Sequence, residues 1–588
     1  MPSISLQAVK TEAPPDYRPP SSASWQDEPL KMEKKHNRNA SSSPSENDDL
    51  AHIVDHDPRT AVRPLSGYHL PIVLFILVFG LFLSTVETSI TATALVKIGI
   101  YFNDSYTANW VVLSYLLTYM GFSVIFARLS DAIGRKFAIL LSWLIFGFFS
   151  LASGLSTSLT QLIIFRSFQG IGGSGLFTMA MTVAPQVTPV KYWGLLSGSL
   201  GAALACSSLI GPIAGGVITQ RFGWRWIYLY NAPCAAMIII PFLLSWPKDR
   251  PHANQPRSLL LTQVDVPGAL LLLSASTLLV FALDQGGSYR LNWNSTTIIL
   301  CLLTSALCGI MFICWIIFVE AGKCRINIKP IFSLKSSLVR PIGPAIALSF
   351  MSGFPFFIVM INLPIRFQIL NGNSPTMAGV HLMPLLALSA TGSCIGGLFS
   401  VSKNRTYYTL VFAFVLMCLG TGLLSTIPNS RVISHLQYLY QAILGLGIGL
   451  SLSSITVMTG LASNYESIAS VNGAVNQARV LGGSIGLSVA NIILNNEISN
   501  KLTGILTPME LTDLQQSLNT AIKLAPSKQL EVVRVYASSF NSQMRICLYL
   551  SILGFFVSHL TYKRVPASVR AYQAQQEAMN NNDQVNQP

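Results

Sequence analysis

The chain has 588 residues, of which 51% are hydrophobic and only 11% are charged. Soluble domains carry about 25% charged residues, so this composition excludes an ordinary soluble protein and predicts a polytopic membrane protein. The net charge of +14 does not indicate a nucleic-acid partner, because the basic residues lie in short loops between apolar runs and form no patch.

The first 67 residues are rich in Pro, Ser and charged residues, and we predict a disordered cytoplasmic tail over 1–67. No apolar core with a small-residue cleavage site precedes residue 70, so we expect no cleavable signal. A second cytoplasmic tail is predicted over 563–588. The nine cysteines and eight histidines form no CxxC or HExxH pattern, so no disulfide framework, metal site or cofactor is expected.

Fourteen apolar runs follow the first tail, and each is long enough to cross a bilayer, which takes about 20 residues. These predicted spans are 70–96, 108–127, 137–156, 162–184, 193–218, 226–246, 264–284, 296–319, 341–365, 376–399, 407–426, 435–460, 470–494 and 543–562. Lys and Arg are more frequent in the loops on the side of the tails, so both termini are predicted to be cytoplasmic. Asn103 and Asn294 begin N-x-[ST] sequons in predicted outer loops and are candidate glycosylation sites.

The first span carries Glu87, the only formally charged residue between Arg63 and Lys97. Ser84, Glu87 and Thr91 are three and four residues apart and share one helix face. A charge near the bilayer centre costs at least about 2.5–3.5 kcal/mol, so it usually faces a cavity and serves a function. Because burial disfavours the charged form, Glu87 is a candidate for proton binding, and a hydrogen-bonded structural role is the alternative.

The loop between spans two and three reads "ARLSDAIGRK" over 127–136. Asp131 can cap a helix or pair with Arg135, and Gly134 allows a tight turn. Arg135 and Lys136 anchor the cytoplasmic face. An ordinary positive-inside loop is the alternative interpretation of these residues.

Spans four and five contain small residues at close spacing. Span four includes "RSFQGIGGSG" over 166–175, in which Arg166 is the embedded charge. Span five includes "SLIGPIAGG" over 208–216, in which small residues allow close helix packing and the proline predicts a kink; its key positions are Gly211, Pro212, Gly215 and Gly216.

Two further charges lie at predicted span ends. Asp265 begins span seven and is expected to cap that helix, and Arg479 is expected to anchor the inner end of span thirteen. The segment 495–541 is predicted to be an outer loop rather than a span. It contains "TPME" at 507–510, which has the pattern of a capping box and predicts a short helix on the outer surface.

These motifs resemble the major facilitator superfamily. The loop over 127–136 is similar to the family signature G-x-L-x-D-x-x-G-R-K, and 166–175 is similar to R-x-x-Q-G-x-G-G. The segment 208–216 resembles the G-P-x-x-G-G antiporter motif of exporters. Further segments resemble the fungal fourteen-span drug:proton antiporter branch: "WRWIYLYNAP" (224–233), "DQGGSYRLNWNS" (284–295), "RFQILNGNSPTMAGVHLMP" (366–384) and "ARVLGGSIGLSVA" (478–490).

The chain departs from the family pattern at four positions. Ala127 and Ser207 stand where glycine is usual, Glu87 stands for the usual aspartate of span one, and Val96 stands for a common proline. The longer side chain of Glu87 moves its carboxylate outward by about one methylene relative to aspartate.

The resemblance implies an all-α membrane fold with two six-helix halves, at 68–246 and 341–562, and an inserted helix pair at 263–320. It implies conformational gating by the loop of Asp131, Gly134, Arg135 and Lys136, and proton transfer that involves Arg166 with Glu87. We expect the substrate cavity between the halves, with four candidate lining residues: Tyr115, Gln169, Gln368 and Gln477.

We therefore predict a proton-coupled exporter of small, partly apolar compounds in the cell membrane, which works as a monomer. The expected partners are the lipid bilayer, a small-molecule substrate and protons. An importer or vacuolar transporter of the same fold, for amino acids or siderophores, is the alternative. An enzyme or a sensor is disfavoured, because no P-loop motif and no His/Asp cluster occurs at membrane depth.

Overall fold

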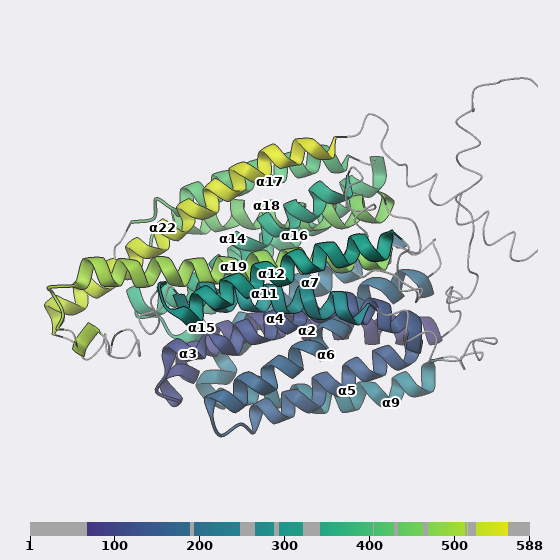
Figure 1. The fold of residues 1–588 in the computed structure, drawn as a ribbon, viewed down its shortest axis with the longest axis horizontal. Coiled ribbons are helices and arrows are strands. Elements are labelled where there is room, and N and C mark those ends of the chain that lie inside the picture. Colours follow the sequence, from purple (N-terminus) through teal and green to yellow (C-terminus); the bar gives the residue numbers. More distant parts are fainter. Residues whose placement is uncertain are drawn as a thin grey trace, which may run out of the picture. The chain divides into compact units, whose positions relative to one another are not determined.

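The computed structural model describes residues 68–188, 193–246, 265–286, 293–321, 341–403, 405–428, 433–462, 468–507, 509–511, 514 and 525–562. Both predicted tails lie outside these residues. Within the described ranges every regular element is a helix, as the apolar runs predict (Figure 1).

The helices before residue 250 match the first six predicted spans. They are α2 (His69–Tyr101), α3 (Ser105–Ala108), α4 (Trp110–Ile133), α5 (Arg135–Gly154), α6 (Leu159–Val187), α7 (Trp193–Arg221), α8 (Trp226–Leu229) and α9 (Asn231–Ser245). We refer to them together as the first bundle. Within it α2 packs on α7, and α6 packs on both α4 and α5.

The remaining helices match the other eight predicted spans. They are α11 (Val266–Gly286), α12 (Thr296–Glu320), α14 (Ile342–Leu370), α15 (Pro375–Val380), α16 (Met383–Lys403), α17 (Thr406–Leu424), α18 (Leu436–Ala462), α19 (Ile468–Leu502) and α22 (Pro526–Ser558). We refer to those from α14 onward as the second bundle. Within it α18 packs on α16 and α17, and α14 packs on α19 and α22.

Eleven helices of the described chain are both long and apolar enough to cross a membrane. The other long helices, α4, α6 and α7, have 24, 29 and 29 residues and lie where spans two, four and five are predicted. The interior of α6 carries polar and small residues that pack against other helices instead of facing lipid.

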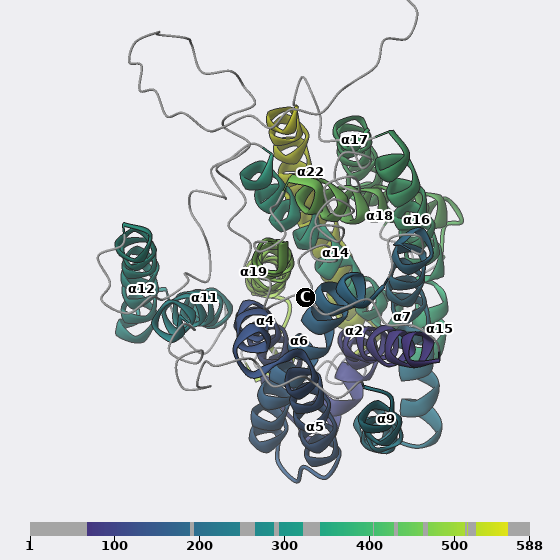
Figure 2. The same ribbon diagram turned by 90° about the vertical axis from the view of Figure 1, so that its right-hand side faces the viewer.

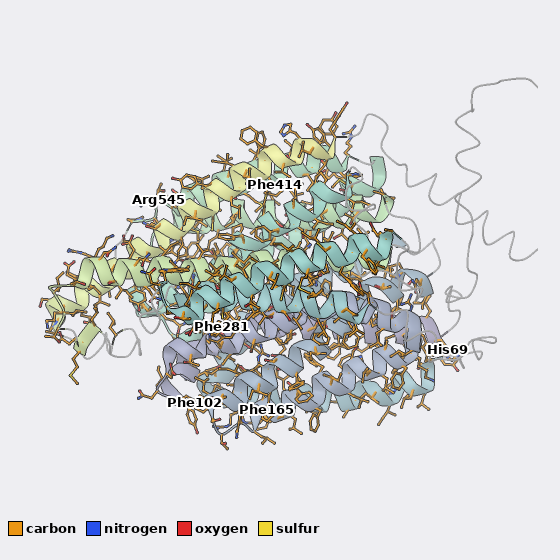
Figure 3. All side chains as sticks on the ribbon, viewed as in Figure 1. His69, Phe102, Phe165, Phe281, Phe414 and Arg545 are labelled. Carbon is orange, nitrogen blue, oxygen red and sulfur yellow. The ribbon has the colours of Figure 1, made fainter. Side chains whose placement is uncertain are left out.

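The two bundles contact each other through a few helices. On one side α4 packs against α19, and on the other α7 packs against α15 and α16. Buried residues of α14 and α19, including Phe357, Val480 and Leu487, join the apolar cluster of the first bundle. A second apolar cluster fills the second bundle. Figure 3 shows side chains filling the space between the helices.

The inserted pair α11 and α12 lies beside this contact. The two helices pack on each other, and α11 also touches α4 and α19, as Figure 2 shows. Only 17% of the most apolar 18-residue stretch of α12 is buried inside the protein. Its exposed Leu and Ile side chains form a surface suited to contact with lipid. Asp265 caps α11 as expected: its Oδ1 accepts from the Gly268 N–H at 2.8 Å and from Trp315 Nε1 at 2.7 Å.

The segment 495–541 differs in form from the prediction. Residues 509–511 and 514 are helical, as predicted for a short helix after the capping box, but α19 continues to Leu502 and α22 starts at Pro526, so less of the segment is loop. At 1.5 Å per residue the 35-residue α19 is about 52 Å long, so it exceeds the bilayer core of about 30 Å. The two helix ends pack together through Ile498, Leu502 and Val532. The capping box is confirmed, since Thr507 N–H donates to Glu510 and Glu510 N–H donates back to Thr507 Oγ1.

Candidate functional site

The polar side chains of α2 form two stripes that face different helices. Thr85 Oγ1 donates to Ser207 Oγ at 2.7 Å, and Ser89 Oγ donates to the Ser207 carbonyl at 3.3 Å, so one stripe faces α7. The other stripe contains Ser84 and Glu87 and faces α4, α6 and α9. Its residues are fully buried. The wealth of Ser and Thr in this span is therefore explained by two helix contacts.

Glu87 forms an ion pair with Arg166 of α6 inside the first bundle. Arg166 Nη1 lies 2.6 Å from Glu87 Oε2, and both side chains are 0% exposed. The other carboxylate oxygen, Oε1, accepts a hydrogen bond from Asn231 Nδ2 of α9. Both oxygens of the carboxylate are thus held by donors from two different helices.

A ring of polar groups holds the pair in place. Arg166 also donates to the Val111 carbonyl at 3.2 Å and to Gln169 Oε1 at 2.8 Å. Ser150 Oγ of α5 accepts from Gln169 Nε2 at 2.8 Å and from Asn231 Nδ2 at 2.9 Å. Buried charges persist only where such bonds satisfy them, so this network is what permits an ion pair at this depth.

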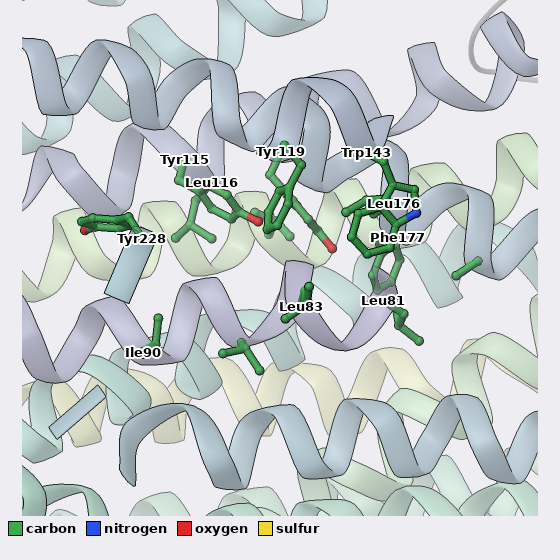
Figure 4. Packing of buried hydrophobic residues seen from close by; sticks show 14 of the residues in the cluster. Leu81, Leu83, Ile90, Tyr115, Leu116, Tyr119, Trp143, Leu176, Phe177 and Tyr228 are labelled. Atoms are coloured by element: carbon green, nitrogen blue, oxygen red, sulfur yellow. The ribbon is translucent and has the colours of Figure 1, made fainter. Parts of the chain in front are cut away.

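Aromatic rings enclose the guanidinium. Its Cζ lies 4.3 Å from the ring centre of Tyr115 and 5.2 Å from that of Tyr228. Both rings are fully buried, and Figure 4 shows them within the apolar cluster. The Tyr115 hydroxyl donates to the Ser84 carbonyl of α2 at 2.9 Å. Cation–π contacts of this kind stabilise a desolvated cation by about 2 kcal/mol.

The structure thus brings Glu87 and Arg166 together, and it places Tyr115 and Gln169 beside them. Gln368 lies in α14 and Gln477 in α19, and the Nε2 atoms of both are buried without a hydrogen-bond partner among the described residues. The assignment of these four residues to a substrate cavity stays a prediction.

The glycines of span five serve the contact between α7 and α2. A Cβ on Gly215 would lie 2.5 Å from the Ile90 carbonyl and from Thr93 Oγ1. A Cβ on Gly211 would collide with Ser89. Gly216 is also buried. The side chain of Ser207, which replaces a usual glycine, is accommodated because it bonds to α2.

Pro212 lies at the contact between the bundles. A Cβ on Gly379 of α15 would come 2.7 Å from the Pro212 carbonyl oxygen, so these backbones touch closely. Nearby, Thr376 Oγ1 donates to Gln220 Oε1 at 2.8 Å. Both contacts lie near the end of α7 that the predicted topology places outside.

The loop between α4 and α5 is a single residue. Gly134 has φ +93° and separates Ile133 from Arg135, so a left-handed backbone makes the turn. Arg135 Nη1 donates to Ser130 Oγ. Lys136 is partly exposed in the first turn of α5. The side chain of Asp131 lies outside the described residues, and the gating role of the loop stays a prediction.

Two arginines differ from their sequence-based interpretation. Arg366, predicted in an outer loop, is 5% exposed and donates to the Ala537 and Pro428 carbonyls at 3.0 and 3.1 Å, because α14 continues to Leu370. Arg479 is not at the helix end, since α19 begins at Ile468 about three turns earlier.

The Asn103 and Asn294 side chains are exposed, and their glycosylation stays a prediction.

The residues that sequence reasoning missed are Asn231 and Ser150. Asn231 stands in the quoted segment 224–233 as its only amide side chain, which is a usable signal in an apolar span. Ser150 has no distinguishing pattern.

Among the described residues no group of three His, Cys, Asp or Glu could hold a metal ion, and the eight described cysteines are unpaired.

The arrangement of the buried ion pair and the helices indicates a class of protein. An ion pair buried among helices that are long enough to span a bilayer, in two bundles that touch through glycine and backbone contacts, is typical of a multi-pass membrane transporter. The profile of the Major Facilitator Superfamily matches residues 77–487, so the chain belongs to that superfamily. It is therefore a multi-pass membrane transporter.

Known relatives agree with this assignment. The chain is 36% identical over 516 residues to "MFS-type transporter FPY5" of Fusarium mangiferae, which covers 86% of each chain. It is 26% identical to "MFS-type efflux pump LUC4" of Fusarium sp, over 88% of this chain and 92% of that protein. It is 29% identical to "Multidrug resistance protein 3" of Bacillus subtilis, over 74% and 81%.

A solved structure supports the fold. An inward-facing bacterial homologue of the human lysosomal transporter Spinster aligns with a TM-score of 0.56 at 14% identity, over 85% of this chain and all of that chain.

Proposed function

We propose that this transporter exports small, partly apolar compounds in exchange for protons, and that Glu87 is the group that binds the proton. The observation that carries the proposal is the buried Glu87–Arg166 ion pair. Protonation of the carboxylate removes its charge, so the pair loses its Coulomb attraction and the guanidinium is left without a counter-charge in a medium of low dielectric.

The geometry ties this event to helix movement. Glu87 is held by α6 through Arg166 and by α9 through Asn231, and the opposite stripe of α2 packs on α7. A change in the charge of Glu87 therefore alters the contacts of α2 with its neighbours. The helix α7 in turn touches α15 and α16 of the second bundle. Alternating access needs a path of this kind between the proton site and the contact of the halves.

Export rather than import is supported by two observations. Relatives over most of the chain are named as an efflux pump and a multidrug resistance protein. The segment 208–216 resembles the antiporter motif, and its glycines make the close α2–α7 contact. We propose the cell membrane as the location, with a vacuolar membrane as the alternative.

The test uses the full chain in inside-out vesicles with an imposed pH gradient, inside acidic. A pH-sensitive dye reports proton release when aromatic compounds that are cationic, neutral or carboxylate-bearing are added. We expect at least one compound class to dissipate the gradient, and Glu87→Gln to abolish this. Glu531→Gln, which alters an exposed pair with Arg534, is the matched control. Proton-driven transport that survives Glu87→Gln would overturn the coupling role, and symport would overturn export.

A further inference from the structure

The inner part of α19 carries polar side chains where this helix packs against α4. Asn476 and Gln477 are 5% and 7% exposed. Asn476 Nδ2, Gln477 Nε2 and Arg479 Nε are buried and have no hydrogen-bond partner among the described residues. All three atoms are donors, and they lie within one turn of the helix.

Arg479 also lacks a counter-charge. Its side chain forms no ion pair with any carboxylate in the described part of the chain, whereas Arg166, the embedded arginine of the first bundle, is paired. Across the interface, Tyr119 of α4 interacts with Asn476 and electrostatically with the Arg479 guanidinium.

The surroundings of these donors are apolar. Val480 of α19 belongs to the same buried cluster as Tyr119, and Gly353 of α14 packs directly against the Arg479 backbone. Arg479 itself is partly exposed, so a ligand can reach it. A buried donor without a partner costs about 1–3 kcal/mol, and a charged one costs more. The three buried donors of α19 are therefore suited to a ligand that supplies acceptor oxygens.

From this geometry we infer that Arg479, Asn476 and Gln477 form a subsite for a carboxylate, or an equivalent anionic oxygen group, on an otherwise apolar substrate. A guanidinium and two amide N–H donors match the acceptors of a carboxylate, and apolar side chains would contact the rest of the molecule. The inference deepens the proposed function, because it names the chemical class that this transporter would carry.

The subsite is connected to the proton site through two rings. Tyr119 stacks on Tyr115 (Figure 4), with ring centres 5.7 Å apart. Tyr115 in turn lies against Arg166. Tyr115 therefore lies against the Glu87–Arg166 pair, and Tyr119 faces Asn476 of α19. A ligand at α19 and a proton at Glu87 would both act on the position of α4.

The experiment measures binding of three matched probes to the purified full chain: naphthalene-2-carboxylate, naphthalene-2-carboxamide and 2-naphthylmethylammonium. A charge-assisted hydrogen bond is worth about 1.5–3 kcal/mol, so we expect the carboxylate to bind about 10–100-fold more tightly than the amide. Arg479→Gln should abolish that preference and Arg479→Lys should retain part of it. Lys501→Gln, which removes a cation from the outer end of the same helix, should have no effect.

Two results would overturn the inference: equal affinities of the unaltered protein for carboxylate and amide, or an unchanged preference in Arg479→Gln. If Arg479→Gln does not fold, Asn476→Leu replaces it, and it should weaken carboxylate binding several-fold without affecting the ammonium probe. Unchanged carboxylate binding in that variant would equally refute the subsite.

Binding is measured without a proton gradient, so its outcome is independent of coupling. If the carboxylate binds as expected and no compound dissipates the gradient, the proposed function fails and the subsite stands. If neutral or cationic compounds dissipate the gradient while the carboxylate and the amide bind with equal affinity, the subsite fails and the proposed function stands.

Discussion

The Glu87–Arg166 pair allows a quantitative test by a double-mutant cycle. The structure gives an Nη1–Oε2 distance of 2.6 Å with both side chains fully buried. Removing one member of such a pair leaves an uncompensated buried charge, which costs about 3–5 kcal/mol. We therefore expect Glu87→Gln or Arg166→Gln alone to lower the free energy of unfolding by about that amount.

The double variant, Glu87→Gln with Arg166→Gln, leaves no buried charge. It should regain a large part of the loss, so that the coupling energy is about 2 kcal/mol or more. It should not recover the full stability, because Arg166 also packs over Tyr115 and donates to the Val111 carbonyl. Proton-driven transport should stay absent, since no titratable group remains in the pair.

The assay is equilibrium unfolding of the purified chain in mixed micelles, with the four proteins compared under one condition. Losses below about 1 kcal/mol in the single variants, or a double variant as unstable as the sum of the two, would show that the buried pair is not energetically coupled. The ion-pair argument would then fail whatever the transport data show.

Three other predictions concern different parts of the chain. Gly215→Ala should force α7 away from α2 and impair both thermal stability and vesicle transport, whereas Gly201→Ala, with open space around it, should be neutral. Gly134→Ala should destabilise by about 1–2 kcal/mol in thermal unfolding, because φ is +93° while no atom lies within 4 Å of the new Cβ. The ammonium of Lys528 and the Thr507 N–H lower the pKa of the Glu510 carboxyl, so the capping box should loosen at acid pH, as measured by hydrogen exchange over 505–511.

The sign of the last prediction follows from linkage. A carboxyl whose pKa is lowered by folding stabilises the folded form above its unfolded pKa of about 4.3, and this stabilisation is lost as the pH falls through the folded pKa. Glu510→Gln should remove the pH dependence of exchange in this segment. An unchanged exchange profile between pH 6 and pH 3 would contradict the assignment. For the glycines, equal behaviour of Gly215→Ala and Gly201→Ala, or a neutral Gly134→Ala, would contradict the packing and φ arguments.

Hydropathy and turn residues predict the helices well, because each span must satisfy its own backbone in lipid. The embedded charges Glu87 and Arg166 also stand out, since an apolar run makes any charge conspicuous. Their contact could not be predicted, because it joins residues 79 positions apart through a helix packing that no local pattern encodes. Asn231 was missed for the same reason, although it lies in a segment that resembles a family motif.

The predicted positions of charged residues near span ends were the least reliable part of the sequence analysis. A basic residue at a helix terminus and one that lies a turn or more inside a longer helix have the same local sequence, so Arg366 and Arg479 were assigned to a loop and to an anchor. Hydropathy marks where the lipid-facing part of a helix ends, but it carries no information on how far the helix continues. The ends of α14, α19 and α22 all differ for this reason.

The length of α19 has a mechanical consequence. The helix runs from the α4 interface to Leu502 without interruption, so its outer tip lies about 35 Å along the axis from Arg479. A tilt of only about 5° at the interface would displace that tip by about 3 Å. The tip is joined to α22 through Ile498 and Val532, so both ends would move as one body. The displacement of these projecting helix ends, which lie outside the apolar span, therefore reports small rearrangements at the contact between the bundles.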